Sequence, residues 1–277
     1  SMAGLRSGDP TEVSEIVSHF TDQGVDAIIA VAQTQRALDA MLSAPVSVPT
    51  ILITSGHTPA AFPRVDIDQA DGVHQIMTLL RDLGHDRIAH IAGPVGDLHS
   101  EARAAAWRDH LSGSTVTPGN APKGELSVNS PDSTVKRERL PFSDKAATPG
   151  PLRRDPTGLL VRGDWSAASG YRATMSLLAL DDLPTAIFAA NDRMAYGALR
   201  ALSERGLSVP HDVSVVGFDD LDGSDCTIPP LTTVRQDHAG LGAATMELLL
   251  EAMAGDPARS IDITPSLMVR VSTAQAR

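Results

Sequence analysis

The chain has 277 residues, which at about 150 residues per domain predicts two domains or lobes. Its composition, 42% hydrophobic and 21% charged, excludes a disordered tail, and no uncharged apolar run reaches the roughly 18 residues that a membrane-spanning helix needs. Acidic residues outnumber basic ones by 34 to 23, and the net charge of -11 opposes binding along a nucleic-acid backbone, which depends on Lys and Arg.

The cysteine content and the first residues bear on the cellular compartment. Cys226 is the single cysteine, so a disulfide framework and a thiolate metal cluster are excluded and a reducing compartment is favoured. Residues 1–4 carry no basic segment followed by an apolar one, so no secretory signal is expected. These features predict a cytoplasmic protein that makes no membrane contact.

The first 112 residues alternate between helix and strand patterns. Asp9, Pro10 and Glu12 stand where a helix has its N-cap, its first-turn proline and a first-turn acid, so a helix is expected to begin there. Short apolar runs typical of buried parallel strands occur at residues 25–31, 48–54 and 87–92. Apolar residues at helical spacing predict further helices at residues 38–42, 73–83 and 101–111.

Residues 113–157 differ in composition from the rest of the chain. Seven of the 19 prolines fall in this segment, together with Ser, Asn, Gly and mixed charges, and no apolar period is sustained. This composition predicts a long surface loop. An interaction segment is the alternative, and composition favours the plain linker.

The alternation resumes after residue 157. Strands are expected at residues 158–161, 185–190, 213–218 and 267–271, with an extended segment at 231–234. Helices are expected at residues 166–180, 194–205 and 241–253. Repeated strand–helix units indicate an α/β fold with parallel sheets covered by helices, and ligands bind such sheets beyond the carboxyl ends of the strands.

Polar side chains gather at these expected strand ends. They fall at residues 54–57, 93–97, 164–165, 191–192, 219–220 and 235–237. Carboxylates, amides and guanidinium groups can each engage adjacent hydroxyls, and an indole such as that of Trp165 can cover the apolar face of a pyranose. A sugar cleft is therefore one interpretation. The other is that these residues are helix N-caps and solvated loops, a role for which Asn191 and Ser166 are well suited.

The motifs of common enzymes and metal sites are missing from the sequence. It contains no G-x-S-x-G elbow, no Walker loop, no G-x-G-x-x-G after a strand and no H-E-x-x-H. Asp219 and Asp220 are neighbours, whose side chains usually point in opposite directions, so they are not expected to share a substrate bond. We therefore expect no catalytic residue, no cofactor and no metal ion.

Several stretches together resemble the signature motifs of the lac repressor family (LacI/GalR regulators). The resemblance covers nearly all of the chain except residues 113–157, and its motifs are highly specific in combination. Two stretches, 163–170 and 226–233, are closer to the founding member than to the family at large. The other motifs are L-G-H-D-R-I-A followed by A-G-P at 83–94, A-N-D-x-M-A at 190–195, V-S-V-V-G-F-D-D at 213–220 and P-P-L-T-T-V at 229–234.

The resemblance implies a periplasmic-binding-protein-like fold of type I. Two Rossmann-like lobes with parallel sheets would enclose a ligand cleft, and the chain would cross between them near Ile67, Gln236 and Pro265. The N-terminal lobe would comprise residues 1–67 and 237–265, and the C-terminal lobe residues 68–236 and 266–277. The family also begins with a helix-turn-helix headpiece, a hinge helix and a first strand–helix–strand, and we expect this chain to start after those elements, without the DNA-binding headpiece.

The same resemblance implies roles for individual residues. Three positions depart from the founding member: Ile53 replaces a sugar-binding aspartate, Val31 an asparagine and His99 a serine. All three would line the cleft, so the sugar need not be a β-galactoside. Asp164 is expected to be structural. The residues that match the family's effector site are Arg103, Asn191, Asp219 and Gln236 as sugar-hydroxyl binders, Trp165 as the stacking indole, and Ile67 and Leu241 as apolar wall.

The implied function is effector sensing in transcriptional regulation. A small sugar or glycoside would bind between the lobes and change their relative angle, and this change would control operator binding through the headpiece. Operator DNA would therefore be reached only through that headpiece, and a homodimer is expected. The alternative from another class is a transport-type periplasmic sugar-binding protein, which shares the fold.

Overall fold

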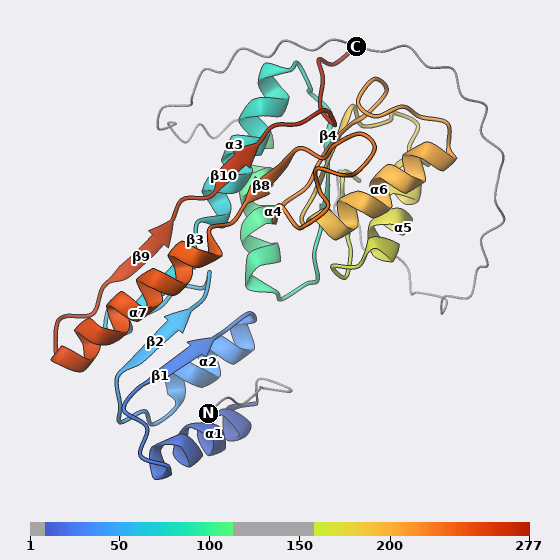
Figure 1. Ribbon diagram of the computed structural model, residues 1–277. Helices are drawn as coiled ribbons and strands as arrows, with labels where there is room; N and C mark the ends of the chain where they lie inside the picture. The colour runs from blue at the N-terminus through green and yellow to red at the C-terminus, as the bar shows by residue number, and fades with distance from the viewer. Residues whose placement is uncertain (1–8, 113–157) are drawn as a thin grey trace.

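Two parallel sheets, each with helices packed on it, form two lobes in the computed structural model (Figure 1). The structure describes residues 9–112 and 158–277. The surface loop expected at 113–157 lies outside these described residues. Among them, none of the helices has the length and apolar character needed to cross a membrane.

The N-terminal lobe contains a four-stranded sheet in the order β1-β2-β3-β9, with all strands parallel. Helices α1 and α2 cover one face, where Val13, Val17 and Leu38 meet Leu52, and α7 covers the other, where Leu248 meets Ile51. The bounds are α1 (Pro10–Asp22), β1 (Ile28–Val31), α2 (Gln35–Ser43), β2 (Thr50–Ile53), β3 (Arg64–Ile67), α7 (His238–Ala254) and β9 (Ser260–Ile263).

The C-terminal lobe contains a second parallel sheet in the order β5-β4-β6-β7. Strand alternation sends Ile88 and Phe188 to the face covered by α3 and α4, and Ile91 and Ile187 to the face covered by α5 and α6. The bounds are α3 (Gln69–Asp82), β4 (Ile88–Ala92), α4 (Leu98–Leu111), β5 (Leu160–Arg162), α5 (Ala167–Leu177), β6 (Ala186–Ala189), α6 (Asp192–Glu204) and β7 (Ser214–Val216).

The chain passes between the lobes after β3, after β8 (Thr233–Arg235) and after β9. Strand β8 pairs antiparallel with β10 (Ser266–Met268), so two of these passages run side by side (Figure 1). The carboxyl ends of the strands of both four-stranded sheets lie at the boundary between the lobes, because Thr34, just after β1, forms an isolated β-bridge with Asp97, just after β4. The boundary is therefore where strand-end side chains of both lobes meet.

Local sequence signals account for most element ends. Asp9, Ser166 and Asn191 are N-caps, and their side chains accept hydrogen bonds from backbone N–H groups of the first helical turn, as expected. Helix α4 begins at Leu98, three residues before its expected start, because Asp97 caps it by accepting from Ser100 N at 2.9 Å. The expected strands and helices are present, and most of the strands are shorter than expected.

Strands β3 and β9 were not expected from the sequence. Arg64 and Asp66 interrupt β3 with charges, and β9 alternates exposed and half-buried residues without an apolar run. Pairing between neighbours makes them strands, since β3 lies between β2 and β9.

Trp107 belongs to the core of the C-terminal lobe, as expected. It is 1% exposed and its ring centroid lies 5.6 Å from that of His90, which stacks on Phe188 at 4.4 Å. Burial lowers the pKa of His90 to about 3, so this imidazole is neutral and packs as an aromatic side chain.

Candidate functional site

Four polar side chains form a hydrogen-bonded ring at the boundary between the lobes. Arg103 Nε donates to Gln69 Oε1 at 2.8 Å, and Gln69 Nε2 contacts Gln236 Oε1 at 3.3 Å. Gln236 Nε2 donates to Asp219 Oδ1 at 2.7 Å, and Asp219 Oδ1 lies 3.6 Å from Arg103 Nη1. Arg103 comes from α4, Gln69 from the start of α3, Asp219 from the residues after β7 and Gln236 from those after β8, so four separate elements converge here.

Arg103 is the buried centre of this ring. It is 3% exposed, its guanidinium carbon lies 3.7 Å from the centroid of the Phe218 ring, and Nη1 also donates to the Ala190 carbonyl. Among the described residues Nη2 has no hydrogen-bond partner. Two donors of a buried guanidinium group thus remain for a ligand.

Asp219 and Asp220 point in opposite directions, as expected for neighbours. Both residues adopt positive φ angles, 116° and 54°, in the left-handed region. Asp220 accepts hydrogen bonds from Arg235 Nε and Arg270 Nη2, each at 2.7 Å. This double ion pair fixes the turn and leaves Asp219 facing Arg103, so the pair does not form a dicarboxylate site.

Burial dominates the electrostatics of Asp219. It raises the pKa of the carboxyl group to about 6, although Arg103 and the hydrogen bond from Gln236 favour the ionised form. Burial likewise lowers the pKa of Arg103. Each charged group is therefore only partly compensated, and further hydrogen bonds from a ligand would stabilise both.

Asn191 and Trp165 border the ring on the C-terminal lobe. Asn191 Oδ1 accepts from Met194 N at 2.9 Å as an N-cap, and Nδ2 donates to the Trp165 carbonyl at 3.1 Å, which leaves one amide N–H. Trp165 has a φ of 70° and lies 5.8 Å from the Arg103 guanidinium. Its indole rests directly on Gly93, where any side chain would collide with the ring. Asp164 accepts from Ser166 N at 3.0 Å, a structural contact of the kind expected.

The remaining predicted site residues lie around this ring. The Ile67 carbonyl accepts from Gln69 Nε2 at 2.8 Å, and the side chain is buried at the end of β3. Val31 and Ile53 are register partners at the ends of β1 and β2, and Val31 is 55% exposed. Leu241 is half-buried and packs with the α7 core. His99 is the second residue of α4, one turn before Arg103.

Gln69 was not singled out as a site residue from the sequence, although it links Arg103 to Gln236. It directly follows the N-cap Asp68 at the end of β3. The rule that ligands bind just beyond strands identifies it once β3 is recognised as a strand.

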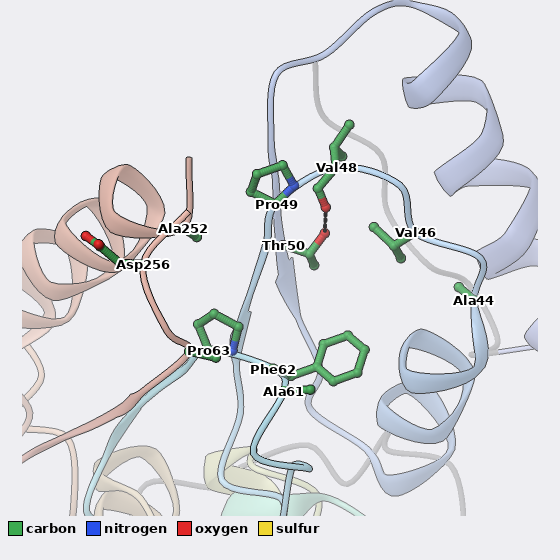
Figure 2. Close-up of a pocket in the computed structure, with 11 residues that line it drawn as sticks. Ala44, Val46, Val48, Pro49, Thr50, Ala61, Phe62, Pro63, Ala252 and Asp256 are labelled. Atoms are coloured by element: carbon green, nitrogen blue, oxygen red, sulfur yellow. Dashed lines mark hydrogen bonds between the residues drawn. The ribbon is translucent and has the colours of Figure 1, made fainter. Parts of the chain in front are cut away.

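A separate pocket of about 330 Å³ lies at the other end of the N-terminal sheet (Figure 2). Its walls are the segments around the starts of β2, β3 and β9 and the end of α7, and most of their side chains are apolar. The Thr50 hydroxyl already donates to the Val48 carbonyl at 3.1 Å, and Asp256 is the one charged residue in the lining of this pocket. Its side chains offer few of the hydrogen-bonding groups that the ring at the lobe boundary provides. The lining residues are Ala44, Val46, Val48, Pro49, Thr50, Ala61, Phe62, Pro63, Ala252, Asp256 and Ala258.

Comparison with known proteins identifies the family. A sequence profile described as a periplasmic binding protein-like domain matches residues 169–273. The lactose operon repressor of Escherichia coli (strain K12) is 30% identical over 99% of this chain and 70% of that protein. The chain belongs to the lac repressor family. It carries the effector-binding core of a LacI-type transcriptional repressor.

Solved structures of the family agree with this assignment. A lac repressor dimer bound to operator and the anti-inducer ONPF matches with a TM-score of 0.73 at 29% identity, over 97% of this chain and 80% of that one. A complex of the transcriptional regulator CelR with cellobiose matches with a TM-score of 0.71 at 28% identity, over 95% and 70%. These relatives are transcriptional regulators rather than transport proteins or enzymes, so the regulator is supported over the transport-type alternative.

Proposed function

We propose that the ring at the lobe boundary binds a small sugar or glycoside as the effector of this regulator. The observation that supports this most is the pair of unfilled polar groups, Arg103 Nη2 and the second oxygen of Asp219, on a buried ion pair at 3.6 Å. One donates and the other accepts, which suits adjacent hydroxyl groups. Asn191 and Gln236 would add amide contacts, Trp165 would cover a sugar face, and Ile67, Leu241, Ile53, Val31 and His99 would form the surrounding wall.

The proposed lobes follow the passages of the chain. Residues 1–67 with 237–265 would move as one lobe and residues 68–236 with 266–277 as the other, and the membership of the two sheets supports this division. An effector that contacts both lobes stabilises the arrangement in which it makes more contacts, so its binding shifts their relative angle. Operator DNA would respond to that angle through a headpiece, as the operator-bound relative suggests, and we propose that this occurs in the cytoplasm.

Calorimetric titration with lactose, cellobiose, galactose and glucose tests the proposed ligand class. At least one of them is expected to bind with an affinity that falls tenfold or more in an Asp219→Asn variant, since this substitution removes a charge-assisted hydrogen bond. Binding of nucleobases with no response to any of these sugars would contradict the sugar assignment.

Intrinsic fluorescence tests the position of the sugar ring. Trp165 borders the site and Trp107 is buried in the core, so sugar binding is expected to change the emission of Trp165 only. The change should persist in Trp107→Phe and disappear in Trp165→Phe. A signal that follows Trp107 would reject the stacking role of Trp165.

We also propose a homodimer, as in the lac repressor relative. Ile228 is 90% exposed, more than any other large hydrophobic side chain that the structure describes, and an apolar group of this kind suits a two-fold contact. Ile228→Asp is expected to weaken dimerisation tenfold or more in analytical ultracentrifugation. The control is Val95→Asp, which charges another exposed residue of the C-terminal lobe, 63% exposed. Equal effects of both variants, or a monomeric wild type at tens of micromolar, would reject this interface.

A further inference from the structure

A second group of polar side chains lies beside the ring, on the N-terminal lobe. Asp66 is in β3, one residue before Ile67, and its side chain is 9% exposed. His99 Nε2, from α4 of the C-terminal lobe, lies 3.9 Å from Asp66 Oδ1. Ser55, which follows β2, is the third member. The lobes touch directly here, since the N–H of Leu98, next to His99, donates to the Gln33 carbonyl at 2.8 Å.

The polar atoms of this group are poorly satisfied by the protein. The contacts of Asp66 with charged groups are long, 3.6 Å to Arg64 Nη1 and 3.9 Å to His99. The Ser55 hydroxyl and the Ile67 N–H favour the ionised form of Asp66, yet the Ser55 oxygen is buried without a hydrogen-bond partner of good geometry among the described residues. Buried polar atoms are normally hydrogen-bonded, and unfilled ones at a ligand cleft indicate groups that the ligand completes.

The charges around Asp66 do not compensate it fully. Arg64 is shared with Asp262, to which its Nη2 donates at 2.5 Å, and Arg103 exerts a weaker attraction through space. Burial outweighs these attractions and raises the pKa of Asp66 to about 6, while burial and Arg103 lower the pKa of His99 to about 4. At pH 7 the group thus holds an under-solvated carboxylate beside a neutral imidazole.

We infer that Asp66, Ser55 and His99 form a second hydrogen-bonding subsite, which receives a hydroxyl group of the effector and determines which sugars this regulator accepts. The inference rests on the proposed sugar-binding function. A hydroxyl there donates to Asp66 and accepts from Ser55 or His99, so it joins the two lobes. This subsite supplies the polar contacts of the N-terminal lobe in a protein whose Val31 and Ile53 are apolar.

The test compares Asp66→Asn with Asp262→Asn. The second substitution weakens an ion pair of Arg64, which also pairs with Asp66, and Asp262 is not part of the subsite. A carboxyl group whose pKa is raised by folding destabilises the fold when it ionises. In the wild type the free energy of unfolding contributed by Asp66 therefore falls as the pH rises from about 4 through 6. In the ligand-free protein Asp66→Asn is therefore expected to raise the Tm by about 2–5 °C at pH 7.5 and by less near pH 4. Asp262→Asn should leave the Tm unchanged or lower it.

Calorimetry with the same four sugars completes the test. The sugar that binds wild type is expected to bind Asp66→Asn tenfold or more weakly, and to bind Asp262→Asn normally. A lowered Tm of Asp66→Asn at pH 7.5 would show a structural acid and overturn the subsite without reference to any sugar. Wild-type affinity in Asp66→Asn, together with weakened binding in Asp219→Asn, would reject the subsite and retain the proposed function. No sugar binding in wild type would instead reject the proposed function.

Discussion

Replacing Arg103 by alanine is expected to abolish measurable sugar binding and to lower the free energy of unfolding by about 3–5 kcal/mol, the usual cost of removing one partner from a buried ion pair. The substitution leaves Gln69 Oε1 and the Ala190 carbonyl without the donor that Arg103 supplies, and it removes the cation from Asp219, which keeps the hydrogen bond from Gln236. It also uncovers the Phe218 ring, on which the guanidinium lies at 3.7 Å. Without the cation, the pKa of Asp219 rises further, which favours the protonated carboxyl group and weakens it as a charge-assisted acceptor.

Arg108→Ala provides the matched control for this experiment. Arg108 lies on the same helix, five residues further on, and is exposed. Its removal should change neither the free energy of unfolding, measured with urea, nor the free energy of sugar binding, measured by calorimetry, by more than a few tenths of a kcal/mol. Equal stability of the two variants would contradict the structural role of Arg103 in the ring. Wild-type sugar affinity in Arg103→Ala would show that the ring is not the binding centre.

Replacing Gly197 by alanine is expected to destabilise the protein by about 2–3 kcal/mol, although alanine is the better helix former. Helices α5 and α6 approach so closely that a Cβ atom at Gly197 would overlap the Ala167 carbonyl and approach Tyr171 N, and one at Gly170 would overlap the backbone of Met194. Overpacking costs about 1–3 kcal/mol or more when the obstacle is backbone, which exceeds the gain of about 1 kcal/mol in helix propensity.

The substitution Gly242→Ala in α7 is expected to stabilise the protein, the opposite of the effect of Gly197→Ala. Nothing lies within 4 Å of the added methyl group, so only the propensity gain of about 0.5–1 kcal/mol remains. Urea unfolding of both variants measures the difference. Stabilisation by Gly197→Ala would mean that the two helices are not in backbone contact.

The fold was largely predictable because strong local signals agree with the tertiary arrangement. Asp9 and Pro10 begin α1, and apolar runs such as the one ending at Ala92 become fully buried strands. Strand β3 escaped prediction because its sequence, Arg-Val-Asp-Ile, carries two charges, and the Asp262 partner of Arg64 is 198 residues away in the chain. An ion pair between residues so far apart in the sequence produces no recognisable pattern in the residues around either partner.

The candidate site was predictable to the extent that a residue's neighbours in sequence determine its surroundings. Asp219 and Gln236 lie at expected strand ends, Arg103 matches the family's effector site, and the structure brings all three into one ring. Gln69 and Asp66 depend on β3, so they were missed together with that strand. Burial, which sets the pKa of both Asp66 and Asp219, comes from the packing of two lobes and is invisible in any short stretch.

Two members of the ring stand on the passages between the lobes. Gln69 follows β3 and Gln236 follows β8, and their side chains meet at 3.3 Å. A rotation of one lobe against the other must twist these backbone segments, so under the proposed function the ring that binds the effector includes residues of the segments that bend. In that case the binding site and the hinge share the same backbone segments, so ligand binding acts directly on the hinge in this part of the molecule. The change in the angle between the lobes then depends on a few backbone torsion angles beside the ligand, and no chain of distant side chains is needed to transmit it.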